Sequence, residues 1–180
     1  MNTAPQPEPA DEAASAATES ARLAATAYHE AGHAVMALAV GRAVQKVTIV
    51  PGNMLGGGVR LGACEMKKGR AKSSHDAVEE SVLILLAGMV AEAHFTDRYC
   101  PQGAAQDLRA ARRLLQGRAA SQRQLERLER RLVDKTEHLL SEAGKAKAIE
   151  SIAAELVQRT TLSGRAVRHL YEQAERPHRD

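Results

Sequence analysis

The segment His29-Glu30-Ala31-Gly32-His33 constrains this chain most, because it reads His-Glu-x-x-His inside an apolar run that favours a helix. On a helix, residues four positions apart project from the same face, about one turn apart. The imidazoles of His29 and His33 can therefore hold one zinc ion. Glu30 can then act as general base toward a water molecule at the open coordination position of the zinc. The pattern predicts peptide hydrolysis, with two satisfied core histidines as the alternative.

The residues around this motif predict a buried helix over residues 20–40 that ends at Gly41. Gly32, between the two histidines, is a poor helix former that costs about 1 kcal/mol relative to alanine, which fits a place where another element packs closely. An apolar stripe at three- and four-residue spacing supports the helix. Its members are Ala27, Ala31, Ala34, Val35 and Leu38.

The composition indicates one domain with an aliphatic core. The chain has 180 residues, no Trp, one Phe and three Tyr, and its net charge is +3. With few aromatic side chains to stack on bases, and basic residues spread along helices, we expect no nucleic-acid partner. We predict a disordered tail over residues 1–18, a domain over residues 19–175 and a short tail over residues 176–180.

The compartment is predicted from what the chain lacks. Its first twenty residues contain no apolar stretch, so we expect no signal peptide, and the longest apolar runs are too short to span a bilayer. We therefore expect no membrane span and a reducing cytoplasmic location, with Cys64 and Cys100 unpaired.

The remaining segments alternate between short strands and long helices. We expect a strand over residues 44–50, a turn at Pro51 and Gly52, and a short returning strand over residues 59–61. Residues 66–72 read as a basic loop, and the glycines at 56–58 read as a hairpin tip rather than a phosphate site. A buried helix is predicted over residues 74–95, and the chain from Ala105 onward is helical, with breaks near Gly117, Gly144 and residues 163–164.

The β-branched strand suggests a way to hold substrate. An edge strand can pair with an extended peptide through its main chain. We predict that the residues that bind substrate in this way are Val47, Thr48, Ile49 and Val50.

A catalytic zinc needs a third protein ligand, and no short extension of the motif supplies one. The ligand must then come from a distant element. On residue type alone the candidates are His75, Asp76, Glu92, His94, Asp97 and Asp107.

Several motifs, in the same order along the chain, resemble the FtsH-type peptidase domain of family M41. They are Ala27-Tyr28-His29-Glu30-Ala31-Gly32-His33-Ala34-Val35, Val47-Thr48-Ile49-Val50-Pro51, Leu85-Leu86-Ala87-Gly88-Met89-Val90-Ala91-Glu92, Gly103-Ala104-Ala105-Gln106-Asp107-Leu108 and Thr161-Leu162-Ser163-Gly164.

The resemblance implies one zinc ion per chain, held by His29, His33 and Asp107, with Glu30 as the catalytic base. Glu92 also matches a position of the family, and we expect it either to hydrogen-bond a ligand histidine or to be a satisfied surface charge. The implied fold is mainly α-helical, of the α+β class, with a small β-hairpin or sheet beside the His-Glu-x-x-His helix.

The resemblance also bears on partners. The family joins this domain to membrane helices and an AAA ATPase, neither of which we expect in this polypeptide. We therefore predict a zinc metalloendopeptidase that acts on unfolded or extended polypeptides. The alternative is a non-catalytic, zinc-stabilised interaction module, or a peptidase subunit that works with a separate AAA ATPase. A homo-oligomeric ring, as in the family, is a further expectation.

Overall fold

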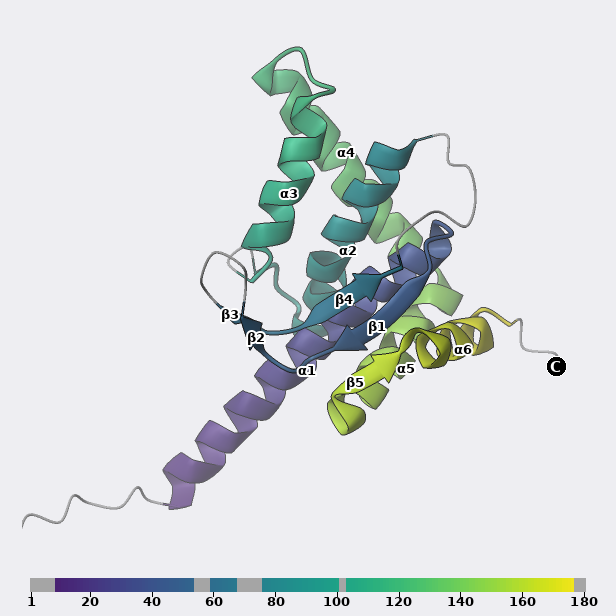
Figure 1. Ribbon diagram of the computed structural model, residues 1–180. Coiled ribbons are helices and arrows are strands. Elements are labelled where there is room, and N and C mark those ends of the chain that lie inside the picture. Colours follow the sequence, from purple (N-terminus) through teal and green to yellow (C-terminus); the bar gives the residue numbers. More distant parts are fainter. Residues whose placement is uncertain (1–8, 54–58, 68–75, 101–102, 177–180) are drawn as a thin grey trace, which may run out of the picture.

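The computed structural model describes residues 9–53, 59–67, 76–100 and 103–176 (Figure 1). Helices account for most of this part of the chain, and the strands are short. The expectation of a mainly helical α+β domain with a small sheet is confirmed. The elements are α1 (Pro9–Ala39), β1 (Val44–Thr48), β2 (Gly52–Asn53), β3 (Val59–Arg60), β4 (Ala63–Met66), α2 (Ala77–Thr96), α3 (Ala105–Gln116), α4 (Gln122–Leu140), α5 (Ala143–Arg159), β5 (Thr161–Ser163) and α6 (Gly164–Glu175).

Helices α1 and α2 cross in the middle of the molecule, and α2 is buried on nearly every side. At the crossing, a Cβ atom on Gly32 would lie 2.4 Å from the backbone oxygen of Ala87 and 2.6 Å from the Cβ of Ala91. Because only glycine lacks a Cβ atom, only glycine lets the two backbones approach this closely. The glycine that weakens α1 locally is therefore what allows α1 and α2 to pack.

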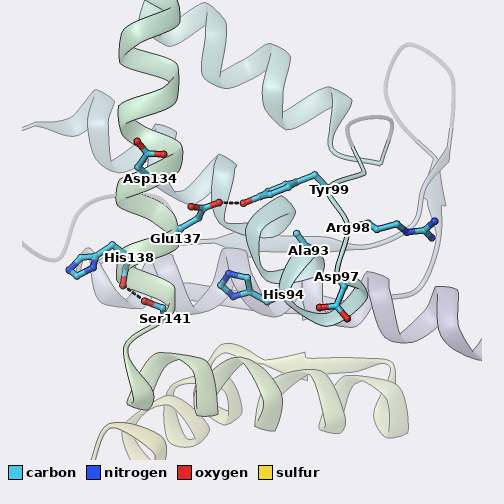
Figure 2. Close-up of a pocket in the computed structure, with 9 residues that line it drawn as sticks. All are labelled: Ala93, His94, Asp97, Arg98, Tyr99, Asp134, Glu137, His138 and Ser141. Atoms are coloured by element: carbon cyan, nitrogen blue, oxygen red, sulfur yellow. Dashed lines mark hydrogen bonds between the residues drawn. The ribbon is translucent and has the colours of Figure 1, made fainter.

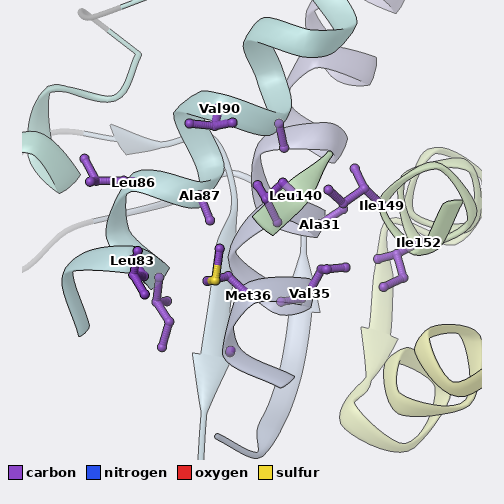
Figure 3. Packing of buried hydrophobic residues seen from close by; sticks show 14 of the residues in the cluster. Ala31, Val35, Met36, Leu83, Leu86, Ala87, Val90, Leu140, Ile149 and Ile152 are labelled. Carbon is purple, nitrogen blue, oxygen red and sulfur yellow. The ribbon is translucent and has the colours of Figure 1, made fainter. Parts of the chain in front are cut away.

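The core continues from this crossing to α5. Figure 3 shows Val35 and Met36 of α1 between α2 on one side and Ile149 and Ile152 of α5 on the other. Met36, Ile152 and Leu140 of α4 are almost fully buried. Each such side chain contributes about 1.5–3 kcal/mol through its removal from water, so an aliphatic core without tryptophan is sufficient here.

The three-stranded sheet has the order β4–β1–β5, with both neighbours antiparallel to β1. Val47 is paired with Cys64 of β4 and with Leu162 of β5. The β1 strand is therefore central, and its main chain has partners on both sides. The prediction that residues 47–50 form an edge strand is wrong, since β5 returns from more than a hundred residues further along the chain to cover it.

The strand that pairs with β1 is not the one predicted over residues 59–61. Residues 59–60 form β3, which pairs with β2 in a separate two-stranded ribbon. The strand that returns along β1 is β4, three residues later. Val44 is opposite Met66 and Thr48 is opposite Ala63, with an irregular register between Val44 and Lys46.

The helix boundaries agree with the sequence in some places and differ in others. Asp76 caps α2 through hydrogen bonds from the backbone N–H groups of Val78 and Glu79 to its Oδ1 atom, and the break at Gly117 is confirmed. The break predicted near Gly144 falls at residues 141–142, and Gly144 itself lies in the first turn of α5. The glycines at 56–58, and the part of the expected basic loop that follows Lys67, lie outside the described residues.

Helix α1 begins at Pro9, eleven residues before the expected start, so part of the expected disordered tail is helical. Alanine, the best helix former, dominates this stretch, and proline is favoured at a first helical position. The N-terminal part of α1 extends away from the rest of the molecule (Figure 1).

Candidate metal centre

Three side chains from two distant helices converge at the α1–α2 crossing. The Nε2 atoms of His29 and His33 lie 3.3 Å and 3.4 Å from Oδ2 of Asp107. Zinc ligands about 2.05 Å from the metal, in tetrahedral arrangement, are themselves about 3.3 Å apart. Among the described residues, these three form the one group of histidine, cysteine and carboxylate side chains close enough to hold a metal ion.

The other ring nitrogen of each histidine has a partner that orients the ring. Nδ1 of His33 lies 2.7 Å from the backbone oxygen of Ile84, which can only accept, so this nitrogen carries the proton. Nδ1 of His29 lies 2.9 Å from Oε2 of Glu92 and donates to that carboxylate. When the rings are neutral, both Nε2 atoms then present lone pairs toward Asp107, as metal-binding histidines do.

Gly88 of α2 makes room for this group. A Cβ atom at this position would lie 2.5 Å from Nε2 of His33 and 2.7 Å from Nε2 of His29. Any larger residue would occupy the space in front of the two donor atoms. Gly88 therefore forms a wall of the site from backbone alone, and the donor set together with this space fits a zinc ion.

The charges of the metal-free group are strongly coupled. Burial alone lowers the pKa of His29, but hydrogen bonds to the carboxylates of Asp107 and Glu92 outweigh burial and raise this pKa to about 10. Burial alone raises the pKa of Asp107, but its hydrogen bonds with His29 and His33 hold this pKa well below its ordinary value. The site therefore attracts positive charge, which a proton on His29 supplies when no metal is bound.

Glu30 lies on the side of the site that faces the sheet. Its side chain is buried, and a Cβ atom on Gly62 would lie 2.7 Å from its Oε1 atom. Gly62 comes directly before β4, so the carboxylate is adjacent to the start of this edge strand. An extended chain paired with β4 would lie beside Glu30.

Three of the alternative third ligands, His94, Asp97 and Asp76, lie away from the metal group. His94 and Asp97, with Glu137 and His138 of α4, line a separate surface hollow of about 730 Å³ (Figure 2). Among the described residues, neither His94 nor His138 belongs to the group that could hold a metal ion. Asp76 is the cap of α2. His75 lies outside the described residues.

The cysteines are not part of the donor set. Both Cys64 and Cys100 are free thiols. Burial, together with the nearby carboxylates of Glu30 and Glu65, raises the pKa of Cys64, so its thiol stays protonated at neutral pH. A protonated thiol is a poor metal ligand.

Three features of the site were not found from the sequence. They are the space at Gly88, the contact of Gly62 with Glu30 and the backbone oxygen of Ile84. A glycine inside an otherwise apolar helix was the one available signal for Gly88, because such a glycine often marks a close approach. Nothing in the sequence distinguishes the Ile84 oxygen from any other backbone oxygen of α2.

Comparison with known proteins agrees with this geometry. The sequence model of peptidase family M41 matches residues 16–120, which is more than half of the chain. The chain therefore belongs to peptidase family M41, a family of metallopeptidases.

Two curated relatives carry the name ATP-dependent zinc metalloprotease FtsH. The protein from Protochlamydia amoebophila is 39% identical over 93 residues, which are 49% of this chain and 10% of the relative. The protein from Metamycoplasma arthritidis is 43% identical over 72 residues, which are 39% of this chain and 9% of the relative. The matched stretch thus spans about a tenth of the length of each relative. In the described part of this chain, no helix combines the length and the apolar character that a membrane crossing requires.

Proposed function

We propose that this chain is a zinc metalloendopeptidase that hydrolyses peptide bonds in extended or unfolded polypeptides. The observation that carries the proposal is the convergence of two Nε2 atoms and one carboxylate oxygen beside a buried glutamate, Glu30. The ligands would be His29, His33 and Asp107, with one zinc ion per chain. The family membership and the names of the two relatives support zinc as the metal.

The chemistry divides between the metal and the protein. A bound zinc ion polarises a carbonyl group and lowers the pKa of water. Glu30 accepts the proton of the attacking water and passes it to the nitrogen of the leaving amine. Glu92 holds His29 in the orientation that directs Nε2 at the site, and the Ile84 oxygen does the same for His33.

Substrate would bind along β4 rather than β1. The β4 strand is at the edge of the sheet, and its first residue follows Gly62, which touches Glu30. An extended polypeptide can add to such an edge through main-chain hydrogen bonds, which are nearly independent of sequence. A folded protein cannot present an isolated extended strand in this way, so we expect unfolded segments or peptides as substrates.

The second candidate function is that of a peptidase subunit that works with a separate AAA ATPase. The two relatives are named ATP-dependent, whereas the matched stretch covers only about a tenth of them. We infer that an AAA ATPase, as a partner, would deliver unfolded substrate, and that several copies of this chain could assemble in a ring. The division into residues 1–18, 19–175 and 176–180 and the cytoplasmic location remain predictions.

The deciding experiment measures zinc content and hydrolysis of an unfolded protein such as casein, for the wild type and for Glu30→Gln. We expect one zinc per chain in both, and a loss of cleavage of about 100- to 10,000-fold in the variant. Glu155→Gln, which changes a partly exposed carboxylate on α5 that pairs with Arg159, is the matched control and should cleave normally. Equal cleavage by Glu30→Gln would refute the mechanism, and zinc without cleavage in the wild type would favour the second candidate.

A further inference from the structure

A small apolar cavity lies between α2, α3 and α4. Its volume is about 170 Å³. An engineered apolar cavity of about 150 Å³ in another protein remains dry and binds benzene. The lining side chains that are apolar are Val82, Leu86, Leu108, Ala111, Leu115 and Val133.

The rim of the cavity is polar at one place. Nη1 of Arg112 on α3 lies 3.3 Å from Oε2 of Glu129 on α4, and both residues line the cavity. A guanidinium group has five N–H donors, and a carboxylate has several acceptor sites, so this single contact leaves capacity for a ligand. The cavity therefore suits one aromatic ring system with at most one hydrogen-bonding group.

The cavity lies beneath the helix that presents Asp107. The buried residues of α3 are Ala111 and Leu115, and both line the cavity. Leu108, directly after Asp107, lines it as well. A helix packed over empty space lacks dispersion contacts on that side, so its position is less firmly determined than that of a fully packed helix.

We infer that this cavity binds small aromatic molecules, and that its occupancy changes the position of Asp107 and thereby the affinity of the metal site. The proposal that aromatic molecules bind here rests on the cavity alone and does not depend on the proposed function. The coupling to zinc rests on the proposed function, because it requires Asp107 to be a ligand. Binding of a molecule and of zinc would then influence each other by the same factor, as linkage demands.

The first experiment titrates indole into the full, zinc-free chain and follows the methyl NMR signals of leucine and valine. We expect saturable shifts at Leu108, Leu115 and Val133. Ala111→Leu places a larger side chain in the cavity and should weaken indole binding roughly tenfold or more, because the space is filled. Ala110→Leu, the neighbouring position outside the lining, is the matched control and should bind as the wild type does.

Should Ala111→Leu fail to fold, Val133→Leu fills the same space from α4 and should weaken binding likewise. An absence of saturable shifts in the wild type would overturn the binding site. Equal indole affinity in wild type and in the cavity-filling variants would overturn it as well.

The second experiment compares indole affinity with and without saturating zinc, and zinc affinity with and without saturating indole. We expect both to change by the same factor, about threefold or more. Unchanged affinities would overturn the coupling. If the chain binds indole but no zinc, the coupling and the proposed function both fail, whereas the binding site stands.

Discussion

The two sides of the metal site are held in place by different means. His29 and His33 lie at the α1–α2 crossing, where Gly32 and Gly88 bring backbone and imidazoles into direct contact. Asp107 lies in the first turn of α3, whose buried residues are Ala111 and Leu115 and which packs over a cavity. The first two donors are therefore positioned by close packing on nearly every side, and the third by a helix with few buried contacts.

This contrast predicts which substitutions the metal site tolerates. A close-packed crossing has no room for an added methyl group, because protein interiors are packed as densely as organic crystals. A helix over a cavity can shift with less loss of contact. Substitutions at the crossing should therefore weaken metal binding severely, whereas changes around α3 should alter it by smaller factors.

Gly88→Ala should have the largest effect. The new Cβ atom would meet both Nε2 atoms, so we expect zinc affinity to fall roughly 1,000-fold, or about 4 kcal/mol, in a competition titration with a chelator. Gly117→Ala is the matched control at the end of α3, where a Cβ atom would meet only the Leu114 oxygen at 3.9 Å. Normal zinc binding by Gly88→Ala would show that the crossing is not as tightly packed as described.

Gly32→Ala tests the same crossing through stability. Its Cβ atom would press on the backbone of Ala87, which cannot move without displacing α2. We expect the free energy of unfolding of the metal-free chain to fall by about 3 kcal/mol, as in other overpacked cores. Urea denaturation measures this loss, and an unchanged midpoint would contradict the close approach of α1 and α2.

Glu92→Gln tests how His29 is oriented. The variant keeps a hydrogen-bond acceptor but removes the charge that faces Nδ1 of His29. We expect zinc affinity to fall about 10- to 100-fold, the usual loss when a partner of a ligand histidine changes. Glu137→Gln, whose carboxylate accepts a hydrogen bond from Tyr99 away from the site, is the control. Equal losses in the two variants would remove the special role of Glu92.

Taken per pH unit, the smallest predicted effect is the pH dependence of zinc affinity. The folded-state pKa of His29 is about 10, above its ordinary value. Its contribution to the stability of the metal-free chain is therefore complete below about pH 6.5 and is lost as the pH rises through about 10. Zinc needs the neutral imidazole, so zinc affinity should rise by up to about tenfold per pH unit between these limits.

The lowered pKa of Asp107 affects stability at acidic pH instead. Its contribution is present above the ordinary pKa of an aspartate and is lost only as the pH falls below it. Asp107 should thus add no slope near neutrality. Calorimetric titrations of zinc in two buffers with different enthalpies of ionisation count the protons released, and a count of zero at pH 7.5 would contradict the raised pKa of His29.

The sequence predicted those parts of the site and fold that depend on neighbours along the chain. The spacing of His29 and His33 placed both imidazoles on one face of a helix, and the apolar run after Asp76 predicted a buried α2. Family resemblance pointed to Asp107 and Glu92, and the structure places both beside His29. Residue types alone left His94 and Asp97 as equal alternatives, which the structure places in a separate hollow.

The strands show what the sequence of a single segment cannot predict. A run of β-branched residues predicted a strand at β1 but could not show which strands lie beside it. Its place in the middle of the sheet depends on β5, which follows α2 to α5 in the chain and is brought beside β1 by the packing of these helices. The edge proposed for substrate is therefore β4 rather than β1, although a strand that begins at Val44 was predicted correctly.

The sequence by itself determined that α1 presents two histidines and a glutamate from one apolar helix, because helical periodicity follows from the backbone alone. The tertiary structure decided what surrounds them. The partners of His29 and His33 are 63, 78 and 51 positions away in the chain. The space left by Gly88 and the cavity under α3 likewise depend on how separate helices meet, and packing between distant segments is the one property that local sequence patterns do not encode.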